Sequence, residues 1–531
     1  MREVGESYRS YSGGDRFDAI VVGSGIGGLS VAALLAKHAD WKVLVLERHT
    51  VAGGFTHVFR RPGYEWDVGV HYIGRVGSPE GDVRVAFDHL TEGRLRWNPM
   101  PEVYDRVKID GRSYAFPAGK ERFREAMKGY FPSESAAIDK YLTTIQAAMR
   151  GRDHYLAEQA IPPAAALVAG PAMRARFLRY ANRTTADVIG SLTQNRELAG
   201  VLTGQWGNYG LPPGRSSFGI HAIIVDHYLE GAGFPIGGAS EIAFTIAPTI
   251  ESRGGKIVVS AEVSGILLDA AGHAIGVRMA DGREFHSKIV ISDAGARNTF
   301  GRLLPASVAP EAHEALARIP PSMSHLCLYV GIRREPGEPE FPGANLWVFP
   351  GPDHDANVAR FNADPEQPFP LQFISFPSAK DPTFEQRYPG RSTIEIVVPV
   401  PYDWFARWSD TRWKRRGPEY DAFKAKFSER LLRELELHVP GVKGRVERSE
   451  LSTPLTTAHF ANQPTGEVYG LSPTPERFES RAIGARTPVK NLFLTGQDAC
   501  VLGVSGALFG GVIAASAILG RNLMSAVAKP S

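Results

Sequence analysis

The chain has few cysteines and little net charge, and each scarcity excludes a class of protein. It has only 2 cysteines, Cys327 and Cys500, in 531 residues. Because they lie far apart in unrelated contexts, neither a disulfide framework nor a metal site is indicated, and a cytoplasmic, reducing location is expected. Cys500 has no C-x-x-C partner and is assigned no redox role. The formal net charge of +3 gives no basis for a nucleic-acid partner.

Long apolar segments are also missing. A transmembrane helix needs about 20 consecutive apolar residues, and the sequence contains no such run. The longest apolar stretch, 19–36, is interrupted by glycines and serines. Residues 1–16 are polar and lack the apolar core of a secretory signal, so we expect a flexible tail there. Any contact with a membrane would therefore be made from its surface.

A glycine-rich loop near the start of the chain carries the first functional signal. In "AIVVGSGIGGLS", Gly23, Gly25 and Gly28 match G-x-G-x-x-G. The loop follows an apolar strand at 18–22 and precedes a segment at 26–38 with apolar residues at helical spacing. A second strand, "WKVLVL", comes next. This βαβ context makes the glycine pattern credible as a dinucleotide-binding motif.

Each residue of the motif has a physical task. Gly23 permits the tight turn, Gly25 lets a diphosphate approach the backbone, and Gly28 allows the helix to pack closely. The diphosphate would lie at the positive helix N-terminus, beside Ile26 and Gly27. Glu47 ends the second strand about 20 residues later, where a carboxylate accepts hydrogen bonds from the adenosine ribose and repels the ribose phosphate of NADP.

The segment after Glu47 favours FAD over NAD. It reads "RHTVAGGF", so a second glycine pair, Gly53-Gly54, follows soon after the ribose acid. Such a pair lets another backbone loop approach the same dinucleotide. An NAD dehydrogenase would instead continue into the next strand–helix unit.

The rest of the chain predicts two interleaved domains. A helix at 133–150 is expected first, and Rossmann-like patterning returns in a helix at 239–252 and short strands with an Asp281-Gly282 hairpin turn. The last piece, "NLFLTGQDACVLGVSGALFGG", reads as a strand, a turn and a Gly/Ala-rich helix. Stretches rich in Trp, Tyr, Phe and Pro separate these parts. We therefore expect an α/β fold with a discontinuous dinucleotide-binding domain and an interleaved α+β substrate domain, divided as 17–75, 231–300 and 486–531 against 76–230 and 301–485.

Several motifs together resemble a known superfamily. "VLVLERHTVAGGF", "YEWDVGVHYIG", "FPIGGASEIAFTIAPTIESRGGKIV", "VISDAGARNTF" and "NLFLTGQDACVLGVSGAL" look like the flavoproteins that include phytoene desaturases, carotenoid isomerases and retinol saturase. "VGVHYIGR" and "TGQD…GVSGAL" are most similar to the retinol saturase branch. The resemblance is poor across 76–200 and 335–450, which would shape the substrate site.

The resemblance implies FAD as the cofactor and assigns residues to it. Gly23, Gly25 and Gly28 would hold the diphosphate and Glu47 the ribose. The helix that opens at Gly503 would point its N-terminus at the flavin and stabilise negative charge on the reduced ring. Gln497 stands where relatives have another residue, which leaves the role of Asp498 open. The further FAD contacts implied are Arg48, Gly53, Gly54, Val263, Gly496, Asp498, Val504 and Ser505.

The substrate chemistry is less well marked. His71 and Tyr72 resemble a segment that lies against the flavin, where they would orient substrate or pass a proton, or only pack beneath the ring. A second aromatic group could be domain core or pocket lining: it comprises Trp206, Tyr209, His221, His227 and Tyr228. His325 and His459 are isolated histidines, for which we expect structural roles.

The resemblance implies an FAD-dependent oxidoreductase acting on carbon–carbon double bonds of an apolar isoprenoid, retinoid or other unsaturated lipid. The retinol saturase likeness favours reduction, while desaturation or cis–trans isomerisation of a carotenoid stays open. A different class, a non-catalytic prenyl- or lipid-binding protein, has the same fold. No second glycine fingerprint is present, so NAD(P)H would bind transiently or a partner protein would supply electrons. Residues 171–183 carry arginines among apolar residues, which suits either a membrane surface or a solvated helix face.

Overall fold

The computed structural model describes residues 4–335 and 341–527. Residues 1–3 of the expected tail, 336–340 of the expected substrate domain and 528–531 of the last stretch lie outside the described residues. The described part of the tail differs from the expectation of flexibility. Its strand β1 (Glu6–Ser7) pairs in parallel with β11 (Lys256–Val259), and Tyr11 is buried. Pairing and burial therefore hold this segment on the first sheet.

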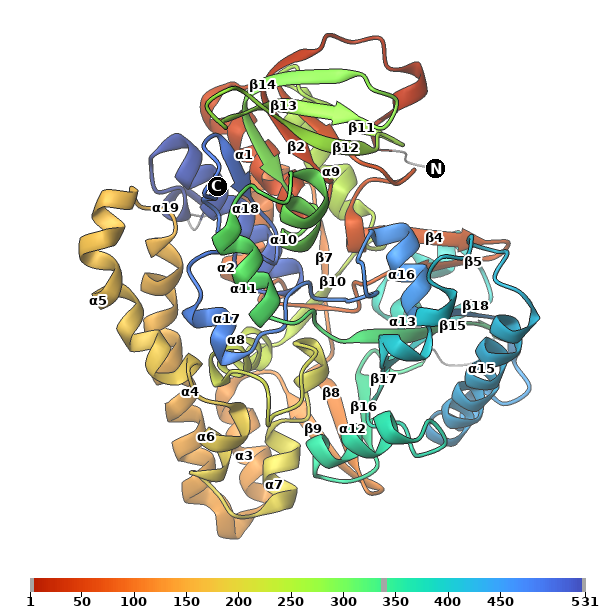
Figure 1. Cartoon of the computed structure of the whole chain (residues 1–531). Coiled ribbons are helices and arrows are strands. Elements are labelled where there is room, and N and C mark those ends of the chain that lie inside the picture. Colours follow the sequence, from red (N-terminus) through yellow and green to blue (C-terminus); the bar gives the residue numbers. More distant parts are fainter. Residues whose placement is uncertain (1–3, 336–340, 528–531) are drawn as a thin grey trace.

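The first sheet has the Rossmann-like arrangement that the glycine motif predicts. Its strands run in the order β1-β11-β3-β2-β14-β13-β12, with β20 beside β14 (Figure 1). The pairs of β2 with β3 and with β14, and of β14 with β20, are parallel. The hairpin between β13 and β14 turns at Asp281-Gly282, as expected. The bounds are β2 Arg16–Val22, β3 Val43–Leu46, β12 Val263–Leu268, β13 Ala274–Met279, β14 Glu284–Ser292 and β20 Leu492–Leu494.

Helices cover this sheet through unusually close contacts. α1 (Ile26–Ala39) follows the glycine loop and packs against α18 (Gly503–Leu519) and α9 (Glu241–Glu251). A Cβ added at Gly511 of α18 would lie 2.5 Å from Ser30 Cβ of α1. Only glycine fits at that crossing, so the small residues of the last helix serve helix packing.

A second sheet faces the first across the molecule. Its strands run in the order β19-β15-β18-β17-β16-β8-β9. Alternate residues of β15 (Leu326, Leu328, Val330) join a core with α15 (Pro418–His438), so the residues between them point to the other face. The bounds are β8 Val103–Ile109, β9 Arg112–Pro117, β15 Ser324–Arg333, β16 Asn345–Phe349, β17 Gln372–Ser375, β18 Arg391–Val400 and β19 Val446–Ser452.

A helical layer completes the second half (Figure 1). α4 packs against both α5 and α8. The helix expected at 133–150 begins at Ser135 and continues to Glu158. No helix in the described ranges is both long and apolar enough to cross a bilayer. The bounds are α3 Lys120–Tyr130, α4 Ser135–Glu158, α5 Pro163–Ala181 and α8 Phe218–Leu229.

Two segments pack differently from the expected domain division. α2 (Asp82–Thr91) packs directly against α9 and α1, and Ala312 and Leu316 of α11 (Pro310–Arg318) lie in the core of the first sheet. Both helices were expected in the substrate domain. We therefore keep the division as a proposal in which these two helices belong to the dinucleotide side.

The two halves are joined by short strands. β6 (Ile73–Gly74), β10 (Ala232–Pro235) and β7 (Trp97–Pro99) form a small sheet, and β4 (Val58–Arg61) pairs with β5 (Tyr64–Asp67). They carry the chain from the glycine loops to the second sheet. The residues expected near a cofactor and those expected near a substrate are thereby brought to one place.

Candidate functional site

A cavity of about 1720 Å³ lies between the two sheets. It is lined from one side by the glycine loops and from the other by the second sheet and α8. Gly28 and Gly496 are not in its wall but pack directly behind it, since a Cβ on either would collide with its neighbours. The sequence-predicted residues that line it are Gly23, Gly25, Ile26, Gly27, Glu47, Arg48, Gly53, Gly54, His71, Tyr72, Val263, Asp498, Gly503, Val504 and Ser505.

The two glycine loops meet, as the second glycine pair predicts. A Cβ added at Gly54 would lie 2.9 Å from Gly25 Cα. Gly53 N donates to Ser24 Oγ at 3.0 Å, and Ser24 Oγ donates to Glu47 Oε2 at 2.7 Å. Both members of the pair have positive φ, 119° at Gly53 and 56° at Gly54. The result is a cradle of bare backbone into which side chains do not intrude.

Glu47 is fixed at the edge of this cradle. Its Oε2 also accepts from Ser24 N at 3.0 Å, and Oε1 accepts from His49 N at 2.7 Å. The residue is 8% exposed. Oε2 already accepts two hydrogen bonds and Oε1 only one, so Oε1 is left to accept a further bond from a ribose.

Asp293 is a site residue that the sequence reasoning did not assign. It directly follows β14, at the carboxyl edge of the parallel strands, and lines the cavity. A Cβ at Gly25 would lie 2.5 Å from Asp293 Oδ2. Burial raises the pKa of Asp293 to about 8, and the carboxylates of Glu47 and Asp498 add to the rise. The signal in the sequence was Asp293 itself, the acidic residue that directly follows the apolar strand in "KIVISDAG". This strand lies next to the strand that leads into the glycine loop.

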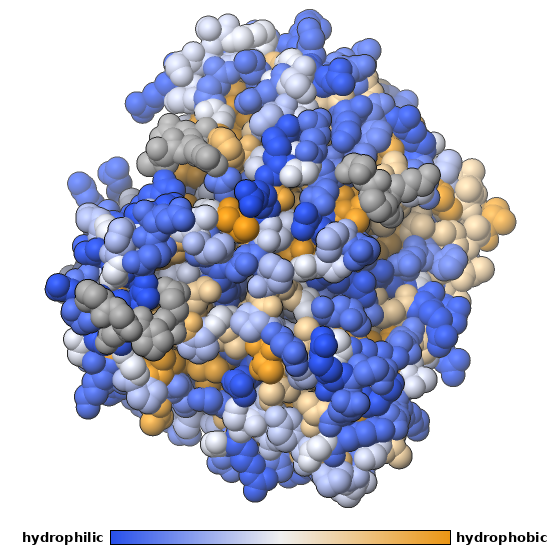
Figure 2. All heavy atoms as spheres, turned by 180° about the vertical axis from the view of Figure 1, so that it is seen from behind, coloured by the Kyte–Doolittle hydropathy of each residue, from blue (hydrophilic) through white to orange (hydrophobic). Residues whose placement is uncertain are grey.

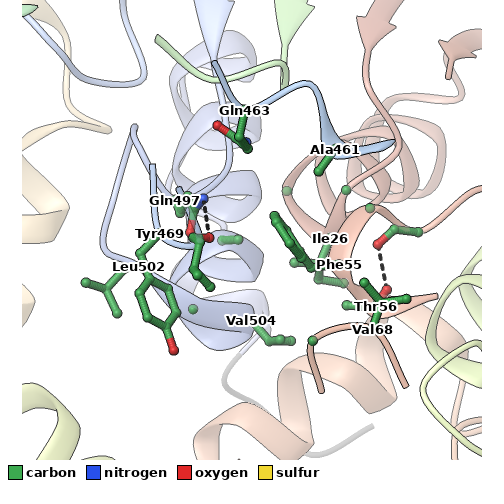
Figure 3. Close-up of a pocket in the computed structure, with 18 of the residues that line it drawn as sticks. Ile26, Phe55, Thr56, Val68, Ala461, Gln463, Tyr469, Gln497, Leu502 and Val504 are labelled. Atoms are coloured by element: carbon green, nitrogen blue, oxygen red, sulfur yellow. Dashed lines mark hydrogen bonds between the residues drawn. The ribbon is translucent and has the colours of Figure 1, made fainter. Parts of the chain in front are cut away.

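The late motif forms the opposite wall (Figure 3). Asp498 accepts from Ala296 N at 2.8 Å and from Leu471 N at 2.9 Å, so it ties three segments together. Figure 3 shows Gln497, Leu502 and Val504 across an open space from Ile26 and Phe55. Within the described residues, the buried Ser505 Oγ has no hydrogen-bond partner.

These features test whether a dinucleotide suits the site. A cradle that a Cβ would fill and an acid beside it suit the diphosphate and the ribose of a dinucleotide, and the unpaired Ser505 Oγ at the start of α18 leaves a polar group free for a ligand. Asn298 Oδ1, also in the cavity wall, is a second buried atom that lacks a partner in the part of the chain described. Arg48 donates to His459 O at 2.8 Å, which anchors one rim of the cradle. The residues present fit the group.

Aromatic side chains form the wall toward the second sheet. The rings of Tyr72 and Tyr228 stack with centroids 4.4 Å apart, and those of Trp347 and Phe373 lie 4.4 Å apart. His227 and His325 also line the cavity. A structural role was expected for His325, but its side chain also lines the cavity. Trp206, Tyr209 and His221 are core residues outside the cavity wall, so the second aromatic group divides between core and pocket.

Tyr72 is committed to a buried hydrogen-bond network. Its hydroxyl donates to Asp105 Oδ2 at 2.8 Å and accepts from Asn208 Nδ2 at 3.0 Å. Asp105 accepts two further bonds, from Gln205 Nε2 at 2.7 Å and Asn345 Nδ2 at 2.8 Å. Burial and the Asp105 charge raise the pKa of Tyr72 well above its usual value. Tyr72 therefore keeps its proton and positions its ring.

His71 faces a buried acid. Its Nδ1 lies 2.9 Å from Glu395 Oε2, although the two groups are not aligned as a hydrogen bond. Burial raises the pKa of Glu395 well above its usual value, whereas burial and the Lys380 charge lower the pKa of His71 to about 3. Lys380 Nζ donates to His71 O at 2.8 Å and fixes that backbone. A neutral imidazole thus sits against an acid that holds its proton.

Sequence reasoning missed Glu395, Lys380 and Asp105. Glu395 has only apolar and hydroxyl-bearing neighbours from Ser392 to Val400 of its strand, and Asp105 lies in a strand that is mostly buried. Charged residues inside buried strands are a usable signal, because burying a charge costs free energy unless it is paired. They fall in regions where the resemblance gave no guidance.

Comparisons with known proteins agree with this arrangement. The family of NAD(P)-binding Rossmann-like domains matches residues 21–90. The all-trans-retinol 13,14-reductase of Danio rerio is 38% identical over 95% of this chain and 86% of its own length. An inactive all-trans-retinol 13,14-reductase of Danio rerio is 30% identical over 98% of this chain and 88% of its own length. Prolycopene isomerase 1 of an Oncidium hybrid cultivar is 26% identical, over 94% and 83%.

Solved structures share the fold. Cyclohexylamine oxidase from Brevibacterium oxydans has a TM-score of 0.57 at 17% identity, over 96% of this chain and 98% of its own. Rab GDI from Plasmodium falciparum has a TM-score of 0.51 at 12% identity, over 96% and 100%. At these identities they speak for the fold alone, and the predicted α/β fold is confirmed. Because the chain is 38% identical to the Danio rerio reductase over 95% of its own length, it belongs to the all-trans-retinol 13,14-reductase family of oxidoreductases.

Proposed function

We propose that the protein is an FAD-dependent reductase of a carbon–carbon double bond in a retinoid or similar apolar isoprenoid. The observation that carries the proposal is that the glycine cradle and an aromatic wall line one and the same cavity. The name of the 38% identical relative supports the reaction and the substrate class. One 30% identical relative is named inactive, so activity must be measured rather than assumed.

The glycine loops, Glu47 and the start of α18 would hold FAD. When bound and reduced, a flavin supplies hydride to one carbon of the double bond. The protein must then exclude water and deliver a proton to the second carbon. The electrons would come from NAD(P)H that binds transiently at the cavity, or from a partner protein.

His71 and Glu395 form the proton-delivery pair in this proposal. Glu395 passes its proton to His71 Nδ1 while His71 Nε2 gives its proton to the substrate carbon. The approach of 2.9 Å and the high pKa of the buried acid support this direction of transfer. Tyr72 and Lys380 act as positioning residues, because each is bonded to a fixed partner.

A direct assay tests the proposal. Protein reconstituted with FAD is reduced chemically without oxygen and incubated with all-trans-retinol, and the product is analysed by mass. A gain of two hydrogens is expected. Loss of two hydrogens with oxidised flavin would identify a desaturase instead, and an unchanged mass with altered geometry would identify an isomerase, the alternative that the prolycopene isomerase relatives favour. A protein that takes up no FAD would point to lipid binding without catalysis.

The protein would meet a membrane surface through α5, since its substrates dissolve in lipid. Leu167 is 79% exposed and Val168 is 83% exposed. Figure 2 shows apolar residues gathered at the edge of the molecule that α5 forms. The exposed Arg176 and Arg179 lie about two turns further along the helix. An apolar tip with a basic band behind it suits the boundary between acyl chains and anionic headgroups.

A further inference from the structure

The carboxyl group of Asp293 lies among four glycines of the cofactor site. A Cβ added at Gly25 would lie 2.5 Å from Asp293 Oδ2, and one at Gly28 would lie 3.1 Å from the same oxygen. A Cβ at Gly27 would lie 2.6 Å from Oδ1, and one at Gly496 would collide with that oxygen. The carboxyl group is therefore in contact with bare backbone of both the first glycine loop and the late motif.

This position is the one that the glycine motif keeps open for a phosphate group. In a G-x-G-x-x-G loop the second glycine has no side chain, so the diphosphate can approach the backbone. Here Asp293 Oδ2 lies directly beside the point where a side chain on Gly25 would begin, and Asp293 also lines the cavity. A bound diphosphate would therefore lie against the Asp293 carboxyl group.

The backbone of Asp293 is held from both sides. Asp293 N donates to Val22 O at 2.8 Å, which continues the pairing of β14 with β2 beyond Ser292. Thr495 N donates to Ser292 O at 3.0 Å and holds the same strand end from β20. The side chain leaves this fixed point between the two cofactor loops, so we expect it to stay beside the diphosphate.

The surroundings of Asp293 disfavour a negative charge on it. Glu47, directly after β3, and Asp498, in the turn before α18, are the charged groups that act on it most strongly. The adjoining ends of β2 and α1 carry no charged side chain, and the positive charge of Arg477 acts on Asp498. Burial and the two carboxylates raise the pKa of Asp293 to about 8, although backbone amides of the glycine loop partly oppose the rise.

A bound diphosphate would favour the neutral form of Asp293 further. It brings negative charge next to the carboxyl group, and it covers the part of the side chain that faces the cavity. Like charge and loss of solvent contact both raise the pKa of a carboxyl group. A protonated carboxyl group can donate one hydrogen bond, whereas a carboxylate only accepts. Protonated Asp293 can therefore bind a diphosphate oxygen that the carboxylate would repel.

We propose that Asp293 is a cofactor-binding residue that acts as a neutral acid: it donates a hydrogen bond to the diphosphate of FAD, and FAD binding is coupled to the uptake of a proton at Asp293. The proton comes from solvent, forms an O–H bond on the carboxyl group and returns to solvent when FAD leaves. This inference rests on the FAD binding in the proposed function and requires no catalysis.

The pH dependence of FAD binding tests this role. The Kd of the apoprotein for FAD is measured by flavin fluorescence at pH 7, pH 8 and pH 9, in the wild type, Asp293→Asn and Asp18→Asn. The amide of Asp293→Asn cannot ionise but still donates a hydrogen bond. Asp18, a half-buried acid on β2 that does not line the cavity, provides the matched control.

Proton uptake is also measured directly, by calorimetry of FAD binding in two buffers with different enthalpies of ionisation. This measurement on the wild type needs no variant, so it decides the inference even if Asp293→Asn does not fold. The thermal midpoint of each apoprotein checks folding.

The expected result follows from the release of the Asp293 proton near pH 8 in the apoprotein. Above that pH, FAD binding must first restore the proton, so the wild-type Kd should rise about tenfold from pH 7 to pH 9. Proton uptake should be about half a proton at pH 8 and roughly nine-tenths at pH 9. Asp18→Asn should match the wild type. Asp293→Asn should show no uptake, a Kd that changes less than about twofold, and tighter binding than the wild type at pH 9.

Two results would overturn the role of Asp293. A wild-type Kd that stays constant from pH 7 to pH 9 without proton uptake would mean that FAD binds beside a carboxylate or away from Asp293. The same pH dependence in Asp293→Asn would assign the proton to another group. If the wild type binds no FAD at any pH, the cofactor proposal itself fails, and the role of Asp293 fails with it.

Discussion

Glu47 is the single residue on which the cofactor assignment depends most directly. A hydrogen bond from a ribose to a carboxylate contributes roughly 1.5–3 kcal/mol. Glu47→Gln should therefore raise the Kd for FAD roughly 10- to 100-fold, measured by flavin fluorescence during titration of the apoprotein. Glu6→Gln, at a partly exposed acid on the same sheet that does not line the cavity, should leave the Kd unchanged. Equal affinities in the two variants would contradict the ribose role.

His71 and Glu395 should act together, since one supplies the proton that the other delivers. His71→Phe and Glu395→Gln should each lower kcat for double-bond reduction roughly 100-fold with FAD binding unchanged. The double variant should be no slower than either single one.

Tyr72→Phe removes one of three donors to Asp105 and should mainly cost stability, about 1–3 kcal/mol by urea unfolding. A Tyr72→Phe variant that folds normally but has lost turnover would move the proton donor to Tyr72.

Asp293 predicts a pH dependence of stability. Its pKa of about 8 in the fold lies far above the value near 3.9 in an unfolded chain. Between these values the folded protein holds a proton that the unfolded chain has released, so its stability falls as pH rises, by about 1.4 kcal/mol per pH unit. Asp293→Asn cannot ionise. In urea unfolding of the apoprotein, the free energy of unfolding of Asp293→Asn should rise relative to that of the wild type from pH 5 to pH 8, whereas that of Asp18→Asn, at a half-buried acid on β2, should not. If the free energies of unfolding of Asp293→Asn and the wild type differ by the same amount at both pH values, the raised pKa of Asp293 would be contradicted.

At the scale of elements, strand and helix patterns predicted the nucleotide-binding half well. The helix expected at 26–38 is α1 at Ile26–Ala39, and the helix expected at 239–252 is α9 at Glu241–Glu251. These elements carry local signals in glycine spacing and apolar periodicity. β15 is different, because nearly every residue in it is buried and no alternation reveals which face meets the cavity. The pattern of β15 therefore does not reveal that His325 lines the cavity.

α5 supplies a prediction at the same scale. Leu167→Glu with Val168→Glu places charges where an apolar tip would enter the headgroup region. The pair should abolish most sedimentation with vesicles of phosphatidylserine and phosphatidylcholine. Leu437→Glu on α15 is the matched control, since Leu437 is also apolar and 70% exposed. Binding that both variants retain would exclude α5 as the contact, and a change of oligomeric state in gel filtration would assign the patch to self-association.

For the molecule as a whole, the cofactor half was more predictable than the substrate half for a physical reason. Backbone cradles need glycine at fixed spacings, and glycine spacing is visible in a sequence. The groups around His71 come from β8, β16, β18 and the segment at Lys380, which the chain brings together over hundreds of residues. Their identities carry no spacing rule, because side chains of many kinds can fill one cavity wall.

A cofactor that bridges the two sheets should stabilise segments from distant parts of the chain together. The cavity wall takes residues from the loop at 23–27, the loop at 53–58 and the turn at 497–505. Hydrogen exchange of these segments should slow when FAD is added to the apoprotein, because a ligand that binds only the folded state opposes local opening. Residues 427–438 of α15 pack on the outer face of the second sheet and do not line the cavity, so they serve as the internal control. Slowing at 23–27 alone would mean that the ligand is held by the first glycine loop without closing against α18. Equal slowing in α15 would mean that the effect is global stabilisation rather than contact at the cavity.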